Sequence, residues 1–240
     1  MAQPGFPEIL FFGDQGYGDE ILRGAWMTVQ ISVCAYAIGL LIGLAGAMGK
    51  LGTNRLLGRI LNFYTTFVRA SPELILILLL YYAGTGLLNT VLASYGFTAV
   101  RVSGFAAAVA VLGFMQGAYA TEVLRAAIQA IPVGQIDAAK AFGMPPWLRF
   151  RRIIIPGMLP LAIPGMANLW LIVTKDSSLI AVVGYTELLL ATRQAAGNTK
   201  LYLLFFACAA FVYLTITLAS NQLFKRVEAY YRRGMPQLGR

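Results

Sequence analysis

The residues that could do acid–base or metal chemistry are few and scattered along this chain. The sequence has 10 Asp and Glu residues and no histidine, and its two cysteines, Cys34 and Cys208, fall within apolar stretches. Histidine triads, histidine metal sites and a disulfide framework are therefore excluded. Gly49-Lys50-Leu51 also fails as a nucleotide-binding loop, because Leu51 replaces the Ser or Thr that would bind Mg²⁺. We therefore expect no catalytic residue, cofactor, metal or ATPase site in this chain.

Glu73 is the acidic residue whose position most strongly indicates function. It follows Pro72 at the start of the apolar run LILILLLYY. An ionised carboxylate inside a membrane is costly and is by default a functional candidate. Two compatible interpretations stay open. The carboxylate could meet a cationic substrate, or it could pair with Arg69, four residues earlier and on the same face of a helix.

Three other charged positions favour structural roles. Glu122 lies three residues before Arg125, and this spacing favours an ion pair over substrate contact. Lys175 and Asp176 follow an apolar run, and we interpret them as anchors of its outer end.

The longest polar interval between apolar segments runs from Gln135 to Pro156. We expect Asp137 in the first turn of a short helix there, where a carboxylate suits the positive end of the helix dipole. A small apolar face and a left-handed helix stop are predicted at four residues: Ala138, Ala139, Phe142 and Gly143. The interval therefore predicts a helix over about residues 134–146, outside the bilayer, that could dock onto another protein.

The composition is that of an integral membrane protein. The chain of 240 residues is 58% hydrophobic and 12% charged, with a mean hydropathy of +0.69, whereas soluble domains are about 25% charged. The net charge is +9, but the basic residues lie mainly between or after apolar runs. They are typical of topology determinants and not of a nucleic-acid-binding face.

Five apolar segments are long enough to cross a bilayer as helices, at about residues 26–48, 74–93, 104–121, 153–173 and 201–220. A shorter run at about 177–191 is either partly inserted or a helix continuation. Glycine pairs at 39/43 and 113/117 have the spacing of close helix–helix contacts. We expect an all-α membrane protein with a single transmembrane domain over residues 1–240.

The charge distribution predicts the orientation. Thirteen of the 19 basic residues fall in the loop Lys50–Arg59, between Arg125 and Arg152, or after Ser220, and residues 1–20 contain four acids and no Lys or Arg. By the positive-inside rule the N-terminus is outside, and the loop around Gly143 and the C-terminus are cytoplasmic.

One spaced motif resembles a known family. Asp137-Ala138-Ala139, Gly143 and Ile153-x-Ile155-Pro156 resemble the EAA loop of bacterial ABC importer permeases, with Asp137 for Glu and Ile155 for Leu. In that family the loop is a coupling helix that seats in a groove of the cytoplasmic ATPase. The resemblance implies this role for Asp137, Ala138, Ala139, Phe142, Gly143 and Pro156. The alternative is a plain cytoplasmic hairpin.

A wider resemblance runs from about residue 20 to residue 230. It is carried by Gly49-Lys50-Leu51, Asn54-Arg55-Leu56, Tyr64-Thr65-Thr66 with Arg69, Pro72 and Glu73, Leu88-Asn89-Thr90-Val91, Gly117-Ala118-Tyr119 with Thr121-Glu122 and Arg125, Ile131-Pro132-x-Gly134, and Lys175 with Ser178-Leu179. The earlier groups resemble the Q-type permease of histidine/lysine/arginine/ornithine and opine importers. The later groups resemble polar amino-acid importer permeases more broadly.

This resemblance implies a type I ABC importer permease of the bacterial inner membrane. Such a chain forms half of the path for basic amino acids (histidine, arginine, lysine or ornithine) or opines. The implied partners are a second, M-type permease, two copies of an ATPase subunit and a periplasmic solute-binding protein, with no nucleic acid. The alternatives are a permease for a non-basic polar amino acid and a stand-alone, ion-coupled secondary transporter. A secondary carrier usually shows an internal repeat, and none is clear in this sequence.

Overall fold

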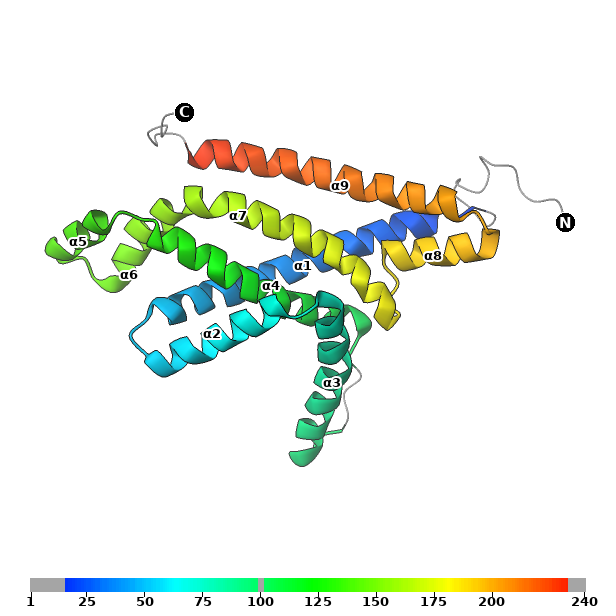
Figure 1. The fold of residues 1–240 in the computed structure, drawn as a ribbon, viewed down its shortest axis with the longest axis horizontal. Helices are drawn as coiled ribbons and strands as arrows, with labels where there is room; N and C mark the ends of the chain where they lie inside the picture. Colours follow the sequence, from blue (N-terminus) through cyan, green and yellow to red (C-terminus); the bar gives the residue numbers. More distant parts are fainter. Residues whose placement is uncertain (1–15, 99–101, 233–240) are drawn as a thin grey trace.

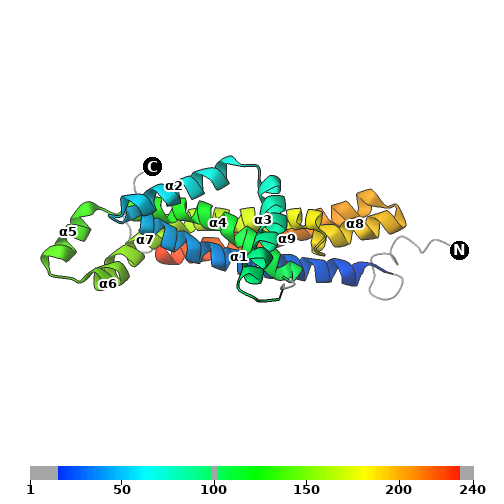
Figure 2. The ribbon, with the colours of Figure 1, turned by 90° about the horizontal axis from the view of Figure 1, so that it is seen from below.

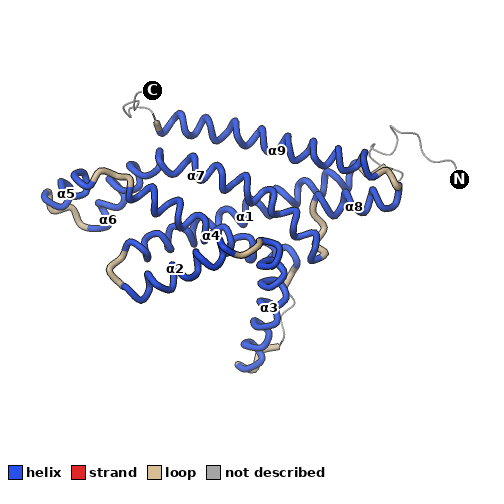
Figure 3. The backbone as a smooth tube through the Cα atoms, in the orientation of Figure 1, coloured by secondary structure: helices blue, strands red, loops and turns tan. Residues whose placement is uncertain are grey.

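Helices account for every regular element in the described part of the chain (Figure 3). The computed structural model describes residues 16–98 and 102–232. The elements, in chain order, are α1 (Gly18–Leu51), α2 (Arg55–Ala70), α3 (Glu73–Ser94), α4 (Gly104–Gln129), α5 (Val133–Ala141), α6 (Pro146–Arg149), the π-helix η2 (Phe150–Ile154), α7 (Ile155–Asp176), the 3₁₀-helix η3 (Ser177–Val183), α8 (Leu188–Thr199) and α9 (Tyr202–Tyr231). The predicted all-α class is confirmed.

Within the described residues, five helical segments are long and apolar enough to cross a membrane: Gly18–Leu51, Glu73–Ser94, Gly104–Gln129, Pro146–Val183 and Tyr202–Tyr231. They match the five predicted spans. Most are longer than predicted, because the helices continue past the apolar run into polar sequence. The marginal run at 177–191 is divided: η3 continues α7 to Val183, and α8 starts after a short turn.

Helix α2 corrects the prediction of a loop from Lys50 to Arg59. The loop is confined to a short turn, and the side chain of Asn54 caps α2 by accepting hydrogen bonds from the backbone N–H groups of Leu56 and Leu57 at 3.0 and 3.1 Å. With 16 residues, α2 is too short to span a bilayer. It runs back along the bundle and packs on α1 and α4 (Figure 1).

The closest helix pair is α1 and α4, and the predicted glycine contacts lie between them. A Cβ atom on Gly39 would lie 2.6 Å from Cβ of Gln116, and one on Gly117 would lie 2.5 Å from Cγ2 of Ile42. Each helix therefore places glycines against side chains of the other. This arrangement brings the backbones close, as small residues do at membrane helix contacts.

The two ends of the bundle differ. The turn between α1 and α2, the α5–α6 hairpin and the last turns of α9 lie at one end, whereas the start of α1 and helix α8 lie at the other (Figures 1 and 2). Helix α3 leaves the bundle and projects from the edge opposite α9 (Figure 1). Among its residues only Leu76 and Ile77 are buried.

Candidate functional site

The helix stop at Gly143 is confirmed in detail. Gly143 has φ of 70°, in the left-handed region. Its N–H donates to the carbonyl of Lys140 at 2.8 Å, and the N–H of Met144 donates to the carbonyl of Ala139 at 3.0 Å. These two bonds form a Schellman motif, which ends α5 and turns the chain toward α6. The result is a short hairpin held at the end of the bundle.

Two expectations about α5 need correction. Asp137 is not in the first turn, because α5 begins at Val133; its carboxylate instead pairs with the ammonium group of Lys140 at 2.9 Å. The apolar face is also divided. Phe142 is 84% exposed, whereas Ala139 is 4% exposed and packs against its own chain. Ala138 is exposed, so Ala138 and Phe142 carry the surface that a partner could contact.

Pro156 lies where the hairpin joins α7. The N–H of Ile155 donates to the carbonyl of Phe150, which is the wide turn of a π-helix. Proline has no N–H to donate to the carbonyl four residues before it, so a widened turn there avoids a clash with that carbonyl. Pro156 therefore follows an irregular turn between the hairpin and the bundle.

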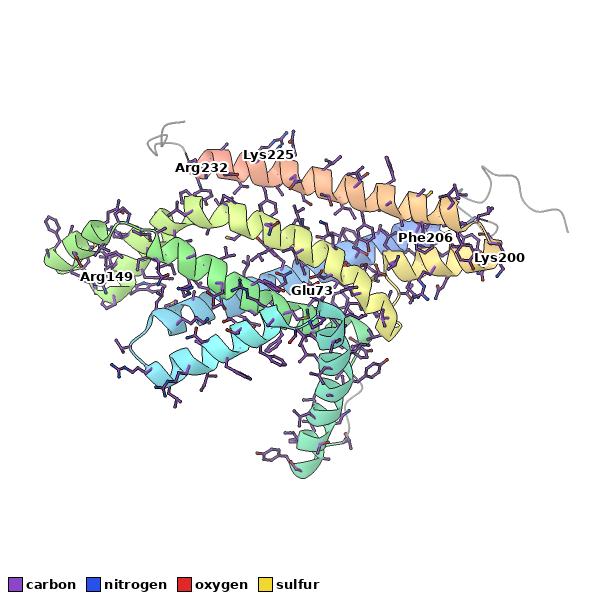
Figure 4. All side chains as sticks on the ribbon, viewed as in Figure 1. Glu73, Arg149, Lys200, Phe206, Lys225 and Arg232 are labelled. Atoms are coloured by element: carbon purple, nitrogen blue, oxygen red, sulfur yellow. The ribbon has the colours of Figure 1, made fainter. Side chains whose placement is uncertain are left out.

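The acidic site around Glu73 is built from three helices. Glu73 begins α3, and Figure 4 shows it midway along the bundle. Tyr119, on α4, donates a hydrogen bond from its hydroxyl to Oε1 of Glu73 at 3.4 Å. The carboxyl group of Asp176, at the end of α7, lies close enough to Glu73 for the two to interact electrostatically. Asp176 thus joins the site of Glu73, a neighbour that the sequence did not predict, while Lys175 beside it is exposed.

Arg69 does not form the expected ion pair with Glu73. Within the described residues the two charged groups do not approach within 4.0 Å. The reason is the break at Ser71 and Pro72, where the backbone is extended and α2 gives way to α3. The four-residue rule applies inside one helix, and these two side chains belong to two helices. Arg69 remains near enough to Tyr119 to interact electrostatically.

The two carboxyl groups make the site suitable for a cation. In the described part of the chain, neither Glu73 nor Asp176 has a salt-bridge partner. Adjacent carboxylates repel each other, and a cation placed between them relieves that repulsion. No group of three or more His, Cys, Asp or Glu residues suited to a metal ion occurs among the described residues.

Glu122 has the structural role that its spacing predicted. Its Oε2 accepts hydrogen bonds from Nη2 and Nε of Arg125 at 2.8 and 3.1 Å. A second partner, not predicted from the sequence, is Lys50. Its Nζ donates to Oε1 of Glu122 and, at 2.6 Å, to Oγ1 of Thr65. This network ties α1, α2 and α4 together near the α5–α6 end.

Glu187 received no interpretation from sequence, and the structure gives it one. Its side chain is fully buried and caps α8 by accepting a hydrogen bond from the N–H of Leu190 at 3.0 Å. Thr28 and Tyr213 also donate to it, at 3.2 and 3.1 Å. Burial raises the pKa of Glu187, and these hydrogen bonds oppose that rise. Glu187 thus fastens α8 to α1 and α9, and no sequence pattern links residues so far apart in the chain.

Comparisons with known proteins agree with this architecture. The chain is 41% identical over 232 residues to the nopaline transport system permease protein NocQ of Agrobacterium fabrum, covering 95% of this chain and 97% of that protein. It is 37% identical to the histidine/lysine/arginine/ornithine transport system permease protein HisQ of Escherichia coli, with 92% and 96% covered.

The fold also matches a solved structure. A chain of the crystal structure of an amino acid ABC transporter with histidines superposes with a TM-score of 0.75 at 27% identity, covering 89% of this chain and 95% of that one. Residues 35–233 match the sequence pattern of a family described as the binding-protein-dependent transport system inner membrane component. With its membrane-spanning helices, its hairpin at one end and relatives that match nearly its full length, this chain belongs to that family.

Proposed function

We propose that this chain is a permease subunit of an ATP-driven importer and forms half of the path for basic amino acids or opines. The observation that carries the substrate class is the proximity of the carboxyl groups of Glu73 and Asp176 in an otherwise apolar bundle. The relatives named for nopaline and for histidine, lysine, arginine and ornithine support the same class. A stand-alone secondary transporter is not supported, because the family works with a binding protein.

The acid pair has the chemistry to recognise a cationic side chain. A guanidinium or ammonium group can donate charge-assisted hydrogen bonds to both carboxylates, and these bonds are roughly twice as strong as neutral ones. The attraction is larger where little water screens it. Because Arg69 forms no ion pair with Glu73, an incoming cation need not displace it from the carboxylate.

The proposed orientation places the α5–α6 end in the cytoplasm. Arg149, Lys225 and Arg232 lie at that end (Figure 4), as the positive-inside rule requires of cytoplasmic segments. The N-terminus is then periplasmic and the C-terminus cytoplasmic. The exposed residues Ala138 and Phe142 of the hairpin would contact the ATPase subunit. Asp137, Gly143 and Pro156 would shape the hairpin. The complex would contain two copies of the ATPase subunit.

The proposed orientation and the exposed surface of α3 suggest where the other partners bind. A periplasmic solute-binding protein would deliver substrate to the end that carries α8. Helix α3 projects with most of its apolar surface exposed, including Leu79, Leu87 and Val91. A second permease of the M type would cover that surface, since a helix so little buried by its own chain can pack against a partner in the membrane.

The test is arginine uptake by the reconstituted importer. Glu73→Gln and Asp176→Asn each remove one negative charge with little change of shape. Because a hydrogen bond to a charged group contributes about 1.5–3 kcal/mol, we expect each variant to lower arginine uptake about tenfold or more. Basal ATP hydrolysis should stay near the wild-type rate, and Glu73→Asp should retain part of the uptake.

The control separates substrate binding from an internal ion pair. Neutralising Arg69 should not rescue Glu73→Gln, because the two groups are not paired. Full arginine uptake by both Glu73→Gln and Asp176→Asn would refute the proposed site. Uptake of a neutral polar amino acid at equal rates in all variants would assign the chain to a non-basic substrate.

A further inference from the structure

An apolar groove runs between α1 and α9 near the N-terminal end of α1, away from the acid site. Its walls are apolar side chains of two membrane-spanning helices, among them Leu22, Ala25 and Trp26 on α1 and Ala207, Phe211 and Ile216 on α9. Helix α9 packs mainly on α7 and α8. Its start also packs on α1, where Phe205 and Ala209 share a buried cluster with Ile21 and Ala25, and the groove lies beside this contact. Small side chains at Ala25 and Ala207 deepen the groove.

The length of the groove matches one leaflet of a bilayer. It extends from Leu204 to Ile216 along α9, which is about 18 Å at the rise of an α-helix. The hydrocarbon core of a bilayer is about 30 Å thick, so one leaflet takes about half of that. A packed partner helix would need a groove through both leaflets. The groove consists of two adjoining hollows. The larger has a volume of about 730 Å³, which is within the range of ligand sites, about 300–1,000 Å³.

A positive charge stands beside this apolar groove. Arg23 lines it and is exposed. Its acidic neighbours Asp19 and Glu20 do not pair with it, since no salt bridge of Arg23 occurs in the described ranges. Side chains of a helix tilt toward its N-terminus, so the guanidinium reaches toward the membrane surface. Trp26 beside it is an aromatic residue of the kind found at that interface.

We propose that this groove binds a membrane phospholipid, with one acyl chain between α1 and α9 and the phosphate on Arg23. The acyl chain matches the apolar walls and the length of the groove. The phosphate matches the guanidinium, which has no salt bridge within residues 16–98 and 102–232 and can form two parallel hydrogen bonds to it. The bound lipid covers the apolar groove between α1 and α9 and stabilises the contact of the two helices.

The test measures lipid binding to the purified transporter complex in detergent by native mass spectrometry. Phosphatidylglycerol and a diacylglycerol with the same chains are the two probes. Arg23→Gln should lower the affinity for phosphatidylglycerol about tenfold and leave diacylglycerol binding unchanged. Ala207→Phe fills the groove from an exposed position and should abolish binding of both probes. Ala210→Phe, exposed on the same helix but outside the groove, is the matched control and should bind both as the wild type does.

Two results would overturn the proposal. Equal affinity for phosphatidylglycerol in the wild type, Arg23→Gln and Ala207→Phe would show that the groove holds no phospholipid. Loss of the second permease from the Ala207→Phe complex, with lipid binding unchanged, would assign the groove to a protein contact. Thermal unfolding without added lipid checks that each variant is folded.

Discussion

Replacing Gly43 with alanine tests how closely α1 and α4 must approach. A Cβ atom at this position would lie 2.8 Å from the carbonyl carbon of Ala120 and 3.0 Å from the nitrogen of Thr121, and it would overlap the Cβ of Ala120 more severely. Ordinary contacts of a Cβ begin at 3.4 Å. Because the obstacles are backbone atoms of α4, no side-chain rotation relieves the overlap, and the two helices must separate.

The expected loss follows from two opposing terms. Overpacking a close contact typically costs about 1–3 kcal/mol. Replacing glycine by alanine inside a helix returns up to about 1 kcal/mol through helix propensity. With the full gain, the net effect of Gly43→Ala is a loss of up to about 2 kcal/mol in the free energy of unfolding. Gly117 on α4 contacts Ile42 on α1 across the same helix pair. Separation of the two helices therefore weakens that contact too.

Thermal unfolding of the detergent-solubilised protein measures this loss. Gly58→Ala is the matched control, because no atom lies within 4 Å of a Cβ built there; it should melt at or above the wild-type temperature. The double variant Gly43→Ala/Ala120→Gly removes the worst overlap and should recover part of the loss, as coupled sites do. If Gly43→Ala melts no lower than Gly58→Ala, the close-contact argument is wrong.

Three further predictions concern other parts of the fold. Glu122→Gln leaves the ammonium group of Lys50, whose side chain is 6% exposed, buried without its counter-charge. Unfolding by denaturant should therefore show a loss of about 3 kcal/mol in the free energy of unfolding, and adding Lys50→Met should partly restore it. Ala138→Trp adds bulk on the exposed surface of α5 and should abolish co-purification of the ATPase while membrane yield stays at the wild-type level; normal recovery of the ATPase would contradict docking there. In a background without the native cysteines, a membrane-impermeant thiol reagent applied to intact cells should label a cysteine at Lys200 and not one at Gly143, and the reverse pattern would invert the orientation.

The spans and the hairpin could be predicted because their causes are local. An apolar run of about 20 residues determines a membrane helix by itself, and Gly143 followed by two prolines determines a helix stop. Helix α2 was missed although its signal is also local. Leu57, Leu61, Tyr64 and Val68 repeat at three- and four-residue spacing after the cap at Asn54, a pattern that predicts an amphipathic helix. At 16 residues the segment is too short to span a bilayer, and the prediction of spans alone therefore left it as a loop.

The contacts around Glu73 could not be predicted from sequence spacing, because they depend on how separate helices pack. The pairing of Glu73 with Arg69 assumed one continuous helix, yet Pro72 disfavours the helical conformation of the residue before it. Asp176 reaches Glu73 because η3, which follows it directly, packs on α3, and no spacing in the sequence expresses that.

The positions of Glu73 and Asp176 at helix ends also stabilise their negative charges to different extents. Glu73 occupies the first turn of α3, where the positive end of the helix dipole favours negative charge. Asp176 lacks this compensation by a helix dipole, because it ends α7 and the chain continues as the helix η3; Lys175 beside it offsets part of its charge. A bound cation therefore relieves more unfavourable energy at Asp176 than at Glu73. We accordingly expect Asp176→Asn to stabilise the substrate-free protein more than Glu73→Gln does, as measured by thermal unfolding without substrate. The opposite order would show that charge at Glu73 is the less compensated of the two.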